Sequence, residues 1–285
     1  MAKLLEGKPI AEKIKEEIGQ QVQSLENKPV LASIMVGENA GAASYVKSQT
    51  KVAENLGIEY QLHKLAQDIS ESALIEFIQK LNSDKAINGI IIQMPLPAQI
   101  DYKRISQFIL PEKDVEGMHP ANIGKIVFGK AVILPCTPAA VMELLKETGV
   151  DLYGKEVVVV GHSEIVGKPL ALLLLDKFAT VCVCHIGTSK AGKLEEHVRA
   201  AEVLIVAVGK AGLIKGDWIK EGAIVIDVGI NRVGDKIVGD VEFEVAEKRA
   251  SSITPVPGGV GPLTVTMLMR NLVEAAKLQE GLFPS

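Results

Sequence analysis

The stretch EVVVVGHSEIVGKPL, residues 156–170, decides which fold we expect for this chain. Four consecutive valines are typical of a buried strand, Gly161 permits a tight turn, and a segment with helical spacing begins near Gly167. A strand, a glycine turn and a helix in this order can hold a pyrophosphate at the helix N-terminus. Ser163 replaces the second glycine of the usual G-x-G-x-x-G pattern, so this stretch alone leaves a plain strand-to-helix turn as an alternative.

Strand-like and helix-like segments alternate along the rest of the chain. Short β-branched runs predict buried strands at residues 29–37, 87–96, 156–161, 179–185, 202–209 and 223–229. Helical periodicity predicts helices at residues 9–25, 41–56, 71–82, 138–149, 167–177, 193–201 and 262–279. This alternation is typical of an α/β protein with a mostly parallel sheet.

The chain is long enough for two domains. Single cores usually stop growing at about 250–300 residues, and this chain has 285. The Pro-bounded turn in PCTPAAVMELL, residues 135–145, opens a helix that leads to the valine strand. We therefore predict one domain from residues 1–137 plus 264–285, and a second, Rossmann-like domain with a parallel sheet from residues 138–263, the two flanking a cleft.

Composition argues against several other classes of protein. A net charge of −4 with mixed signs provides no basic surface for nucleic acid. The apolar run LALLLL at 170–175 is far too short to span a membrane. The N-terminus enters an amphipathic helical pattern without a signal-peptide core, and three cysteines favour a reducing compartment over a disulfide framework. We expect a cytoplasmic protein with no nucleic-acid or membrane partner.

Two further stretches indicate a ligand site. TPVPGGVGPLT, residues 254–264, places three prolines and three glycines just before an apolar helical segment, and QMPLP occupies residues 93–97. Prolines restrict the backbone and glycines expose it, which suits a stiff wall against a flat ligand. A PGG sequence alone would more often be an ordinary turn between domains.

Together these stretches resemble the methylenetetrahydrofolate dehydrogenase/methenyltetrahydrofolate cyclohydrolase family over essentially the whole chain. The residues that carry the resemblance are VGENAGAASY (36–45), QMPLP (93–97), PEKDVEGMHPANIGK (111–125), PCTP (135–138), GHSEIVGKP (161–169), GDWIKEGAIVIDVGIN (216–231) and ITPVPGGVGPLT (253–264). The resemblance implies oxidation of 5,10-methylenetetrahydrofolate to 5,10-methenyltetrahydrofolate by hydride transfer to NAD(P). It also implies that the first domain binds folate and that the chain forms a homodimer through the nucleotide domain.

The resemblance assigns roles to individual residues. Catalytic roles fall on Tyr45, Gln49, Gln93, Asp114 and Glu116. The implied substrate-binding set adds Ile92, Met94, Pro257, Gly258, Gly259, Val260 and Gly261. Tyr45 would stack on the aminobenzoyl ring. The acids at 114–116 would accept paired hydrogen bonds from the pterin.

NADP or NAD is the implied cofactor. The implied cofactor-binding residues are Gly161, His162, Ser163, Ile165, Gly167, Ile186 and Ile230. The family commonly uses NADP, with a basic or hydroxyl group at the positions of His162 and Ile186 for the 2′-phosphate. Because Ile186 offers no donor and His162 is only partly charged near neutral pH, we expect NAD to be used at least comparably. Lys190 or Lys193 could instead supply the charge.

The chain departs from the family at the position of its cyclohydrolase lysine. That lysine normally lies four residues after the tyrosine, where this chain has Gln49. On a helix, Gln49 lies about 40° from Tyr45, whereas Lys47 and Lys51 lie about 200° and 240° away. An amide can orient a water but cannot relay a proton near neutral pH. We therefore expect the cyclohydrolase activity to be weak or lost.

Two other departures agree with this expectation. Glu116 stands where the family usually has aspartate, and Ala42 stands where it usually has serine. Each change alone is compatible with neutral drift. A fully bifunctional dehydrogenase/cyclohydrolase remains an alternative, as do a related two-domain dehydrogenase on another metabolite and a catalytically silent folate sensor.

The remaining conspicuous residues predict no metal site. Cys182 and Cys184 alternate on one strand face before His185, and free cysteines of this kind are commonly packed in the core. Trp218 is expected to pack beside the nucleotide domain, and His63 and His119 are expected in loop or surface positions.

Overall fold

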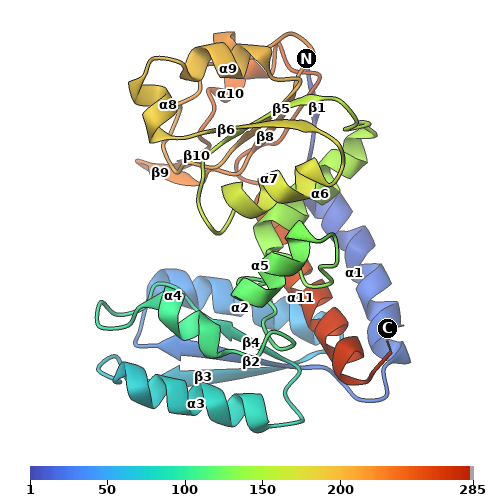
Figure 1. The fold of residues 1–285 in the computed structure, drawn as a ribbon, viewed down its shortest axis with the longest axis vertical. Coiled ribbons are helices and arrows are strands. Elements are labelled where there is room, and N and C mark those ends of the chain that lie inside the picture. The colour runs from blue at the N-terminus through green and yellow to red at the C-terminus, as the bar shows by residue number, and fades with distance from the viewer. Residues whose placement is uncertain (283–285) are drawn as a thin grey trace. The chain divides into compact units, whose positions relative to one another are not determined.

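The computed structural model describes residues 1–282. Its described part divides into two compact units (Figure 1). One unit comprises residues 1–12 and 137–264 and is called here the nucleotide unit. The other comprises residues 13–136 and the segment from Val265 onward and is called the amide unit, after the side-chain network described below. No helix in the described part of the chain is long and apolar enough to cross a membrane.

The nucleotide unit contains a six-stranded parallel sheet. In spatial order its strands are β1 (Lys3–Leu4), β11 (Ser252–Ile253), β8 (Ile224–Asp227), β7 (Val203–Val206), β5 (Glu156–Val160) and β6 (Thr180–Cys184). The central strands form continuous β-branched runs because helices cover both faces of a parallel sheet. The valine strand β5 lies between β7 and β6, so the turn at Gly161 opens at the carboxyl edge of the sheet.

Helices cover the two faces of this sheet (Figure 1). They are α6 (Cys136–Thr148), α7 (Gly167–Leu175), α8 (Ile186–Lys190), α9 (Leu194–Ala200), α10 (Phe243–Ala246) and the 3₁₀ turn η2 (Gly216–Trp218). A two-stranded antiparallel hairpin, β9 (Asn231–Val233) and β10 (Lys236–Val238), follows β8. Trp218 packs against the buried cluster beneath α9 and α10, which confirms its predicted packing role.

The amide unit contains a three-stranded parallel sheet in the order β3 (Glu59–Leu65), β2 (Val30–Val36) and β4 (Gly89–Ile92). Its helices and turns are α2 (Ala40–Asn55), α3 (Glu71–Ser83), α4 (Tyr102–Ile105), η1 (Ser106–Phe108) and α5 (Pro120–Val127). Alternate residues of β2 pack in the hydrophobic cluster with α3, so Ser33 faces the opposite side of the sheet. α1 (Gly7–Ser24) and α11 (Val260–Gln279) continue from one unit into the other along the chain.

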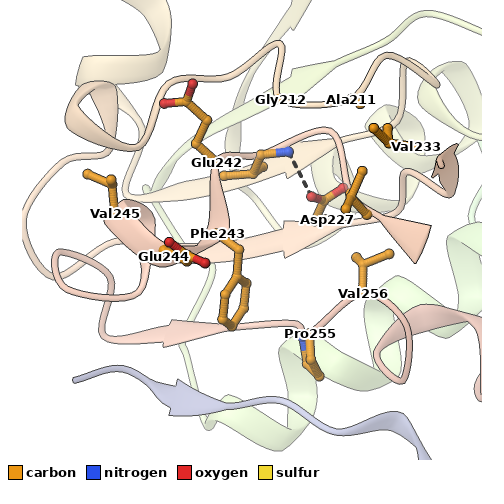
Figure 2. Close-up of a pocket in the computed structure, with 13 residues that line it drawn as sticks. Ala211, Gly212, Asp227, Val233, Glu242, Phe243, Glu244, Val245, Pro255 and Val256 are labelled. Atoms are coloured by element: carbon orange, nitrogen blue, oxygen red, sulfur yellow. Dashed lines mark hydrogen bonds between the residues drawn. The ribbon is translucent and has the colours of Figure 1, made fainter. Parts of the chain in front are cut away.

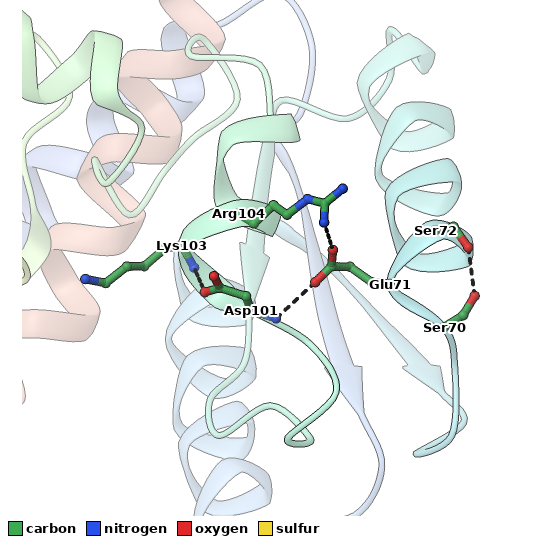
Figure 3. A network of polar contacts seen from close by, with 6 residues as sticks. All are labelled: Ser70, Glu71, Ser72, Asp101, Lys103 and Arg104. Carbon is green, nitrogen blue, oxygen red and sulfur yellow. Dashed lines mark hydrogen bonds and ion pairs between the residues drawn. The ribbon is translucent and has the colours of Figure 1, made fainter.

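A polar network ties α4 to the start of α3 (Figure 3). The Glu71 carboxylate pairs with Arg104 at 2.9 Å and accepts the Asp101 backbone N–H at 3.1 Å. Asp101 in turn caps α4 by accepting the Lys103 backbone N–H at 2.9 Å. The network therefore fixes the first turn of α4, on which Tyr102 stands.

The predicted α/β class and parallel sheet are confirmed, with several differences in detail. Every predicted strand and helix is present, but β4 ends at Ile92 and the last helix begins at Val260. Strand β3 is an additional edge strand whose polar, half-exposed residues give no buried-strand signal. β6 is also an edge strand and is only partly buried. Residues 1–12 group with the nucleotide unit, because β1 pairs with β11, and this differs from the division drawn from the sequence.

Two buried aspartates hold the loops at the carboxyl edge of the nucleotide unit's sheet. Asp240 is fully buried, and its carboxylate accepts four hydrogen bonds. The donors are the backbone N–H groups of Val208 at 2.7 Å, Gly209 at 2.9 Å and Lys210 at 2.7 Å, and the Asn231 side-chain amide at 2.8 Å. One carboxylate therefore joins the loop after β7 to the start of the hairpin.

Asp227, at the end of β8, does the same for the neighbouring loop. Its carboxylate accepts the backbone N–H groups of Gly229 at 2.9 Å, Asp240 at 3.1 Å and Val241 at 2.8 Å. Burial raises the pKa of Asp227 to about 6, against the opposing effect of these hydrogen bonds. Neither aspartate was singled out in the sequence, because their backbone donors lie far away along the chain.

We predict that Asp240→Asn lowers the free energy of unfolding by about 2–4 kcal/mol, since the new amide group would face backbone donors and leave them unsatisfied. Urea denaturation followed by circular dichroism measures this change. Glu244→Gln, on an exposed side chain of the same region, is the matched control and should stay within about 0.5 kcal/mol of wild type. An Asp240→Asn protein as stable as the control would contradict the role given to this carboxylate.

Candidate active site

A buried amide network joins α2, β2 and β4 in the amide unit. The Gln49 side-chain oxygen accepts the Tyr60 hydroxyl at 2.7 Å and the Gln93 side-chain amide at 2.8 Å. The same Gln93 amide nitrogen donates to the Ser33 hydroxyl at 3.0 Å. Gln49 and Ser33 are fully buried and Gln93 is nearly so. Among the described residues, the Gln49 amide nitrogen has no hydrogen-bond partner, which leaves one buried donor available.

Helix α2 turns Gln49 inward and its neighbouring lysines outward. Asn39 caps this helix by accepting the Ala42 backbone N–H at 3.0 Å. The buried stripe of α2 consists of Ala42, Val46, Gln49 and Ala53. Lys47 and Lys51 are both exposed. The predicted inward orientation of Gln49 is therefore confirmed, and neither lysine occupies its place.

Glu116 carries a carboxyl group whose charge is suppressed by its surroundings. Residues 113–116 lie beside β4, because Asp114 pairs with Ile90 in an isolated parallel bridge. The Tyr102 hydroxyl donates to the Glu116 carboxylate at 3.2 Å. Burial raises the pKa of Glu116 to about 8, with the Asp114 carboxylate as the second cause, while hydrogen bonds from Tyr102 and the Ile92 backbone oppose the rise. Glu116 is therefore largely protonated at neutral pH when no ligand is bound.

The Asp114 carboxylate is hydrogen-bonded within its own loop. Its carboxylate accepts the His119 backbone N–H at 2.7 Å and the Asn122 side-chain amide at 3.0 Å. Burial raises the pKa of Asp114 above its usual value, against these hydrogen bonds. Asp114 is thus engaged by its own loop, whereas Glu116 accepts a hydrogen bond from Tyr102. His119 caps α5 through its Nδ1 atom, which accepts the Ala121 backbone N–H at 3.0 Å.

Tyr45 offers an exposed ring beside these polar groups. Its side chain is 39% exposed, although its hydroxyl is buried. Burial raises the pKa of Tyr45 above its usual value, and the nearby Cys136 thiol and Glu116 carboxyl raise it further. The phenol is therefore neutral across the usual pH range and cannot act as a base. Burial also raises the pKa of Cys136, which lies near Glu116.

The two predicted residues on either side of Gln93 differ in burial. Ile92 packs in the core beneath the sheet, so its side chain is directed away from the amide network. Met94 is 51% exposed and directly follows Gln93. The Met94 side chain therefore reaches solvent, whereas the Ile92 side chain does not.

The Gly161 turn has the tight packing that a phosphate-binding turn requires. A Cβ atom on Gly161 would overlap the Ala207 carbonyl oxygen, and one on Gly167 would overlap the Gly161 carbonyl oxygen. Gly161 also has a φ of +124°, which favours glycine. The Ser163 hydroxyl accepts the Val166 backbone N–H at 3.1 Å just before α7 begins. The turn thus brings bare backbone to a helix N-terminus.

The other predicted cofactor residues follow strands β5, β6 and β8 of the same sheet. Ile165 is 56% exposed, and Ile186 and Ile230 are each 67% exposed, which is unusually high for large apolar side chains. His162 and His185 follow β5 and β6, and their ring centroids are 5.1 Å apart. The second histidine was not assigned to this edge from the sequence, because the register that brings it beside His162 is set by β5–β6 pairing.

The loop at 257–261 belongs to the nucleotide unit. Gly258 has a φ of +113°, and its carbonyl accepts the Gly7 backbone N–H at 2.8 Å. A Cβ atom on Gly259 would lie 2.7 Å from the Thr254 Cβ atom. Val260 and Gly261 form the first turn of α11 rather than an extended wall. Pro257 follows a cis peptide bond, as does Pro95.

A pocket of about 780 Å³ lies elsewhere on the nucleotide unit (Figure 2). Its apolar lining comes from the hairpin, the segment around α10 and the chain before Pro257, and includes Val233, Val238, Phe243, Val245 and Val256. None of the predicted cofactor-binding residues lines it. Figure 2 shows Asp227 held beneath this pocket by a backbone donor.

Comparisons with known proteins cover almost the entire chain. The tetrahydrofolate dehydrogenase/cyclohydrolase catalytic domain matches residues 5–116, and the NAD(P)-binding domain of the same family matches residues 135–280. The bifunctional protein FolD of Geotalea uraniireducens is 54% identical over 281 residues, covering 97% of this chain and 99% of that protein.

Solved structures agree with the sequence comparison. The bifunctional FolD enzyme of Campylobacter jejuni has a TM-score of 0.94 and 46% identity, covering 98% of this chain and 99% of that one. The Trypanosoma brucei dehydrogenase-cyclohydrolase, solved with NADP and an inhibitor, has a TM-score of 0.92 and 39% identity, covering 97% and 98%. Because the match extends over both units at this level of identity, the chain belongs to the tetrahydrofolate dehydrogenase/cyclohydrolase family.

Proposed function

We propose that this protein oxidises 5,10-methylenetetrahydrofolate to 5,10-methenyltetrahydrofolate by hydride transfer to NADP or NAD, and that its cyclohydrolase activity is weak or lost. The observation that carries the proposal is the Gln49–Gln93 network beside Glu116 and Tyr45 in a unit that matches the family's catalytic domain. Family membership supports the reaction, and the geometry of Gln49 supports the division between the two activities.

Folate recognition follows from the groups that the amide unit leaves available. The Glu116 carboxyl can accept paired hydrogen bonds from the pterin once it is ionised. The Tyr45 ring is exposed for stacking, and the unpaired Gln49 amide nitrogen can donate to a ligand acceptor. These three groups account for the substrate-binding role proposed for this unit.

The nucleotide unit fits a dinucleotide. Bare backbone at Gly161 and Gly167 lies at the start of α7, and exposed isoleucines follow β5, β6 and β8 of the same sheet. We propose that Gly161, Ser163 and Gly167 hold the pyrophosphate, with Ile165, Ile186 and Ile230 against the rest of the cofactor. When bound, the nicotinamide ring accepts the hydride. Positioning supplies most of this step, because no proton has to move with the hydride.

Hydrolysis of the methenyl product needs proton transfer that the amide network cannot provide. Gln49 and Gln93 are amides, and burial raises the pKa of Tyr60 to about 12. The pKa of Tyr45 is also raised by burial. A ligand at Gln49 would therefore meet the fixed dipoles of this network, and none of the network's own groups exchanges protons readily near neutral pH. We therefore expect the protein to release the methenyl compound without hydrolysing it.

The proposal extends to the oligomeric state and the compartment of the protein. We propose a homodimer formed through the nucleotide unit, supported by the apolar hairpin side chains Val233 and Ile237, which are 55% and 46% exposed. The three cysteines are free thiols, which supports a reducing compartment such as the cytoplasm.

The primary test supplies methylenetetrahydrofolate to the folded protein with NADP or NAD and follows reduced nicotinamide by absorbance. We expect both cofactors to be reduced, with kcat/KM for NAD at least comparable to that for NADP. Gly161→Val, which blocks the proposed pyrophosphate turn, is the control and should remove the signal with either cofactor. No reaction of the folded wild-type protein would contradict the proposed function. A preference for NADP of about a hundredfold or more in kcat/KM would contradict the cofactor assignment alone. Such a ratio means that the protein discriminates between the two cofactors by about 2.7 kcal/mol.

We predict that Gln49→Lys raises hydrolysis of methenyltetrahydrofolate by ~10²–10⁴-fold, the usual contribution of one positioned acid–base group. The matched control is Gln49→Met, which has similar length and no proton to exchange. Decay of methenyl absorbance is measured with wild type, both variants and buffer alone. Wild-type hydrolysis far above the buffer rate would overturn this part of the proposal and would make Glu116 the first candidate for the proton relay.

The raised pKa of Glu116 predicts that the affinity for folate depends on pH. Only the carboxylate form can accept both pterin donors, so affinity should rise with pH and level off above about 8. Below that value it should fall by about tenfold per pH unit, because the proton must leave first. Calorimetric titration with a non-reacting tetrahydrofolate analogue, in buffers of different ionisation enthalpy, should record release of nearly one proton at pH 7. Glu116→Gln should release none. Equal proton release by wild type and this variant would reject the assignment.

A further inference from the structure

Two thiols and an imidazole converge at one edge of the nucleotide unit. Cys182 and Cys184 alternate along β6 and therefore project from the same face of the strand. Their sulfur atoms are 4.0 Å apart. His197 comes from α9, and its Nδ1 atom lies 3.5 Å from the Cys182 sulfur. The three ligand atoms all lie within 4.8 Å of one another.

The histidine in this cluster is not the one adjacent in sequence. His185 follows Cys184 directly, but its Nδ1 atom accepts the Gly187 backbone N–H at 3.1 Å and so caps α8. His197 is brought in because α9 packs across β6, with Leu194 and Val198 buried in the same core as Cys184. The cluster is thus formed by tertiary packing.

Two of the three distances are close to the edges of a tetrahedral metal site, and the third is at most 4.8 Å. With metal–sulfur bonds of about 2.3 Å and metal–nitrogen bonds of about 2.0–2.1 Å, tetrahedral angles give sulfur–sulfur and sulfur–nitrogen separations of about 3.8 Å and 3.6 Å. The observed 4.0 Å and 3.5 Å differ from these by small side-chain movements. A disulfide would instead require the sulfurs to approach to about 2.05 Å.

Burial gives the cluster one enclosed and one accessible side. Cys184 is fully buried, whereas Cys182 and His197 are half-buried at the edge strand. A cation could therefore reach the cluster from solvent and keep a fourth position for water. Two sulfur ligands with one imidazole select a thiophilic cation over Mg²⁺ or Ca²⁺, which prefer oxygen.

We propose that Cys182, Cys184 and His197 form a binding site for a thiophilic divalent cation, with Zn²⁺ as the ligand. The bound cation links the end of β6 to α9. The two cysteines then act as metal ligands and not only as core residues. The site lies within the nucleotide unit, and the inference does not rest on the proposed catalytic function.

The test is titration of reduced, chelator-stripped, full-length protein with Co²⁺, followed by displacement with Zn²⁺. We expect one Co²⁺ per chain, a thiolate-to-cobalt charge-transfer band in the near ultraviolet, the visible bands of tetrahedral cobalt, and loss of all of them on adding Zn²⁺. Cys182→Ser should remove the charge-transfer intensity of its sulfur and weaken binding. His197→Ala should weaken binding by roughly 10–100-fold or more, since loss of even an outer-shell partner costs that much.

Matched variants separate this site from the remaining thiol and imidazole. Cys136→Ser removes the third cysteine, which lies in the amide unit, and His185→Ala removes the neighbouring histidine. Both should bind Co²⁺ as wild type does, and circular dichroism verifies the fold of every variant. Absence of a charge-transfer band from wild-type protein would overturn the proposal. So would a band that persists in Cys182→Ser and disappears in Cys136→Ser.

Discussion

The hydrogen bonds of the Gln93 amide nitrogen connect three elements of the amide unit. By donating to Gln49 on α2 and Ser33 on β2, this one nitrogen fixes two elements relative to the end of β4. The Gln49 oxygen is then saturated by Gln93 and Tyr60, which orients its remaining donor. Because Gln49, Gln93 and Ser33 are buried, breaking a bond between them would leave a polar atom unsatisfied. The network is therefore rigid, and it is built from amides and hydroxyls rather than from groups that exchange protons.

Rigidity of a different origin supports the nucleotide unit. Asp227 and Asp240 are buried carboxylates whose hydrogen bonds come mainly from backbone N–H groups. Such charge-assisted bonds hold loops more firmly than neutral ones. They fix the segments around Gly209 and Ile230 at the carboxyl edge of the sheet, where nucleotides bind in proteins of this architecture. Both units thus use buried polar groups to hold their loops and helices in place.

The sequence predicted the elements with strong local signals and missed those defined by tertiary contacts. The valine run at 157–160 and the helical spacing of α2 led to correct elements, and the same spacing placed Gln49 inward. Edge strand β3 has too few buried residues to be distinguished from a loop. The pairing of β1 with β11 joins residues about 250 positions apart, which no local pattern reveals.

The candidate site shows the same division. Family resemblance selected Gln49, Gln93 and Glu116, all of which lie together in the amide unit. It could not show that the Asp114 carboxylate accepts hydrogen bonds from its own loop, because these bonds depend on the fold of residues 118–122. Nor could it connect His197 with Cys182, since their proximity depends on how α9 crosses β6. The sequence does not determine which side chains interact between different helices, strands and loops.

The central claim is that this protein carries out direct hydride transfer without a coupled proton. Its most direct test is a single turnover with substrate deuterated at both methylene positions, with the product nicotinamide analysed by mass spectrometry. The account predicts one deuterium in every reduced nicotinamide and a rate of transfer that is the same in light and heavy water. Reduced nicotinamide without the label, or a transfer rate that falls in heavy water, would contradict it.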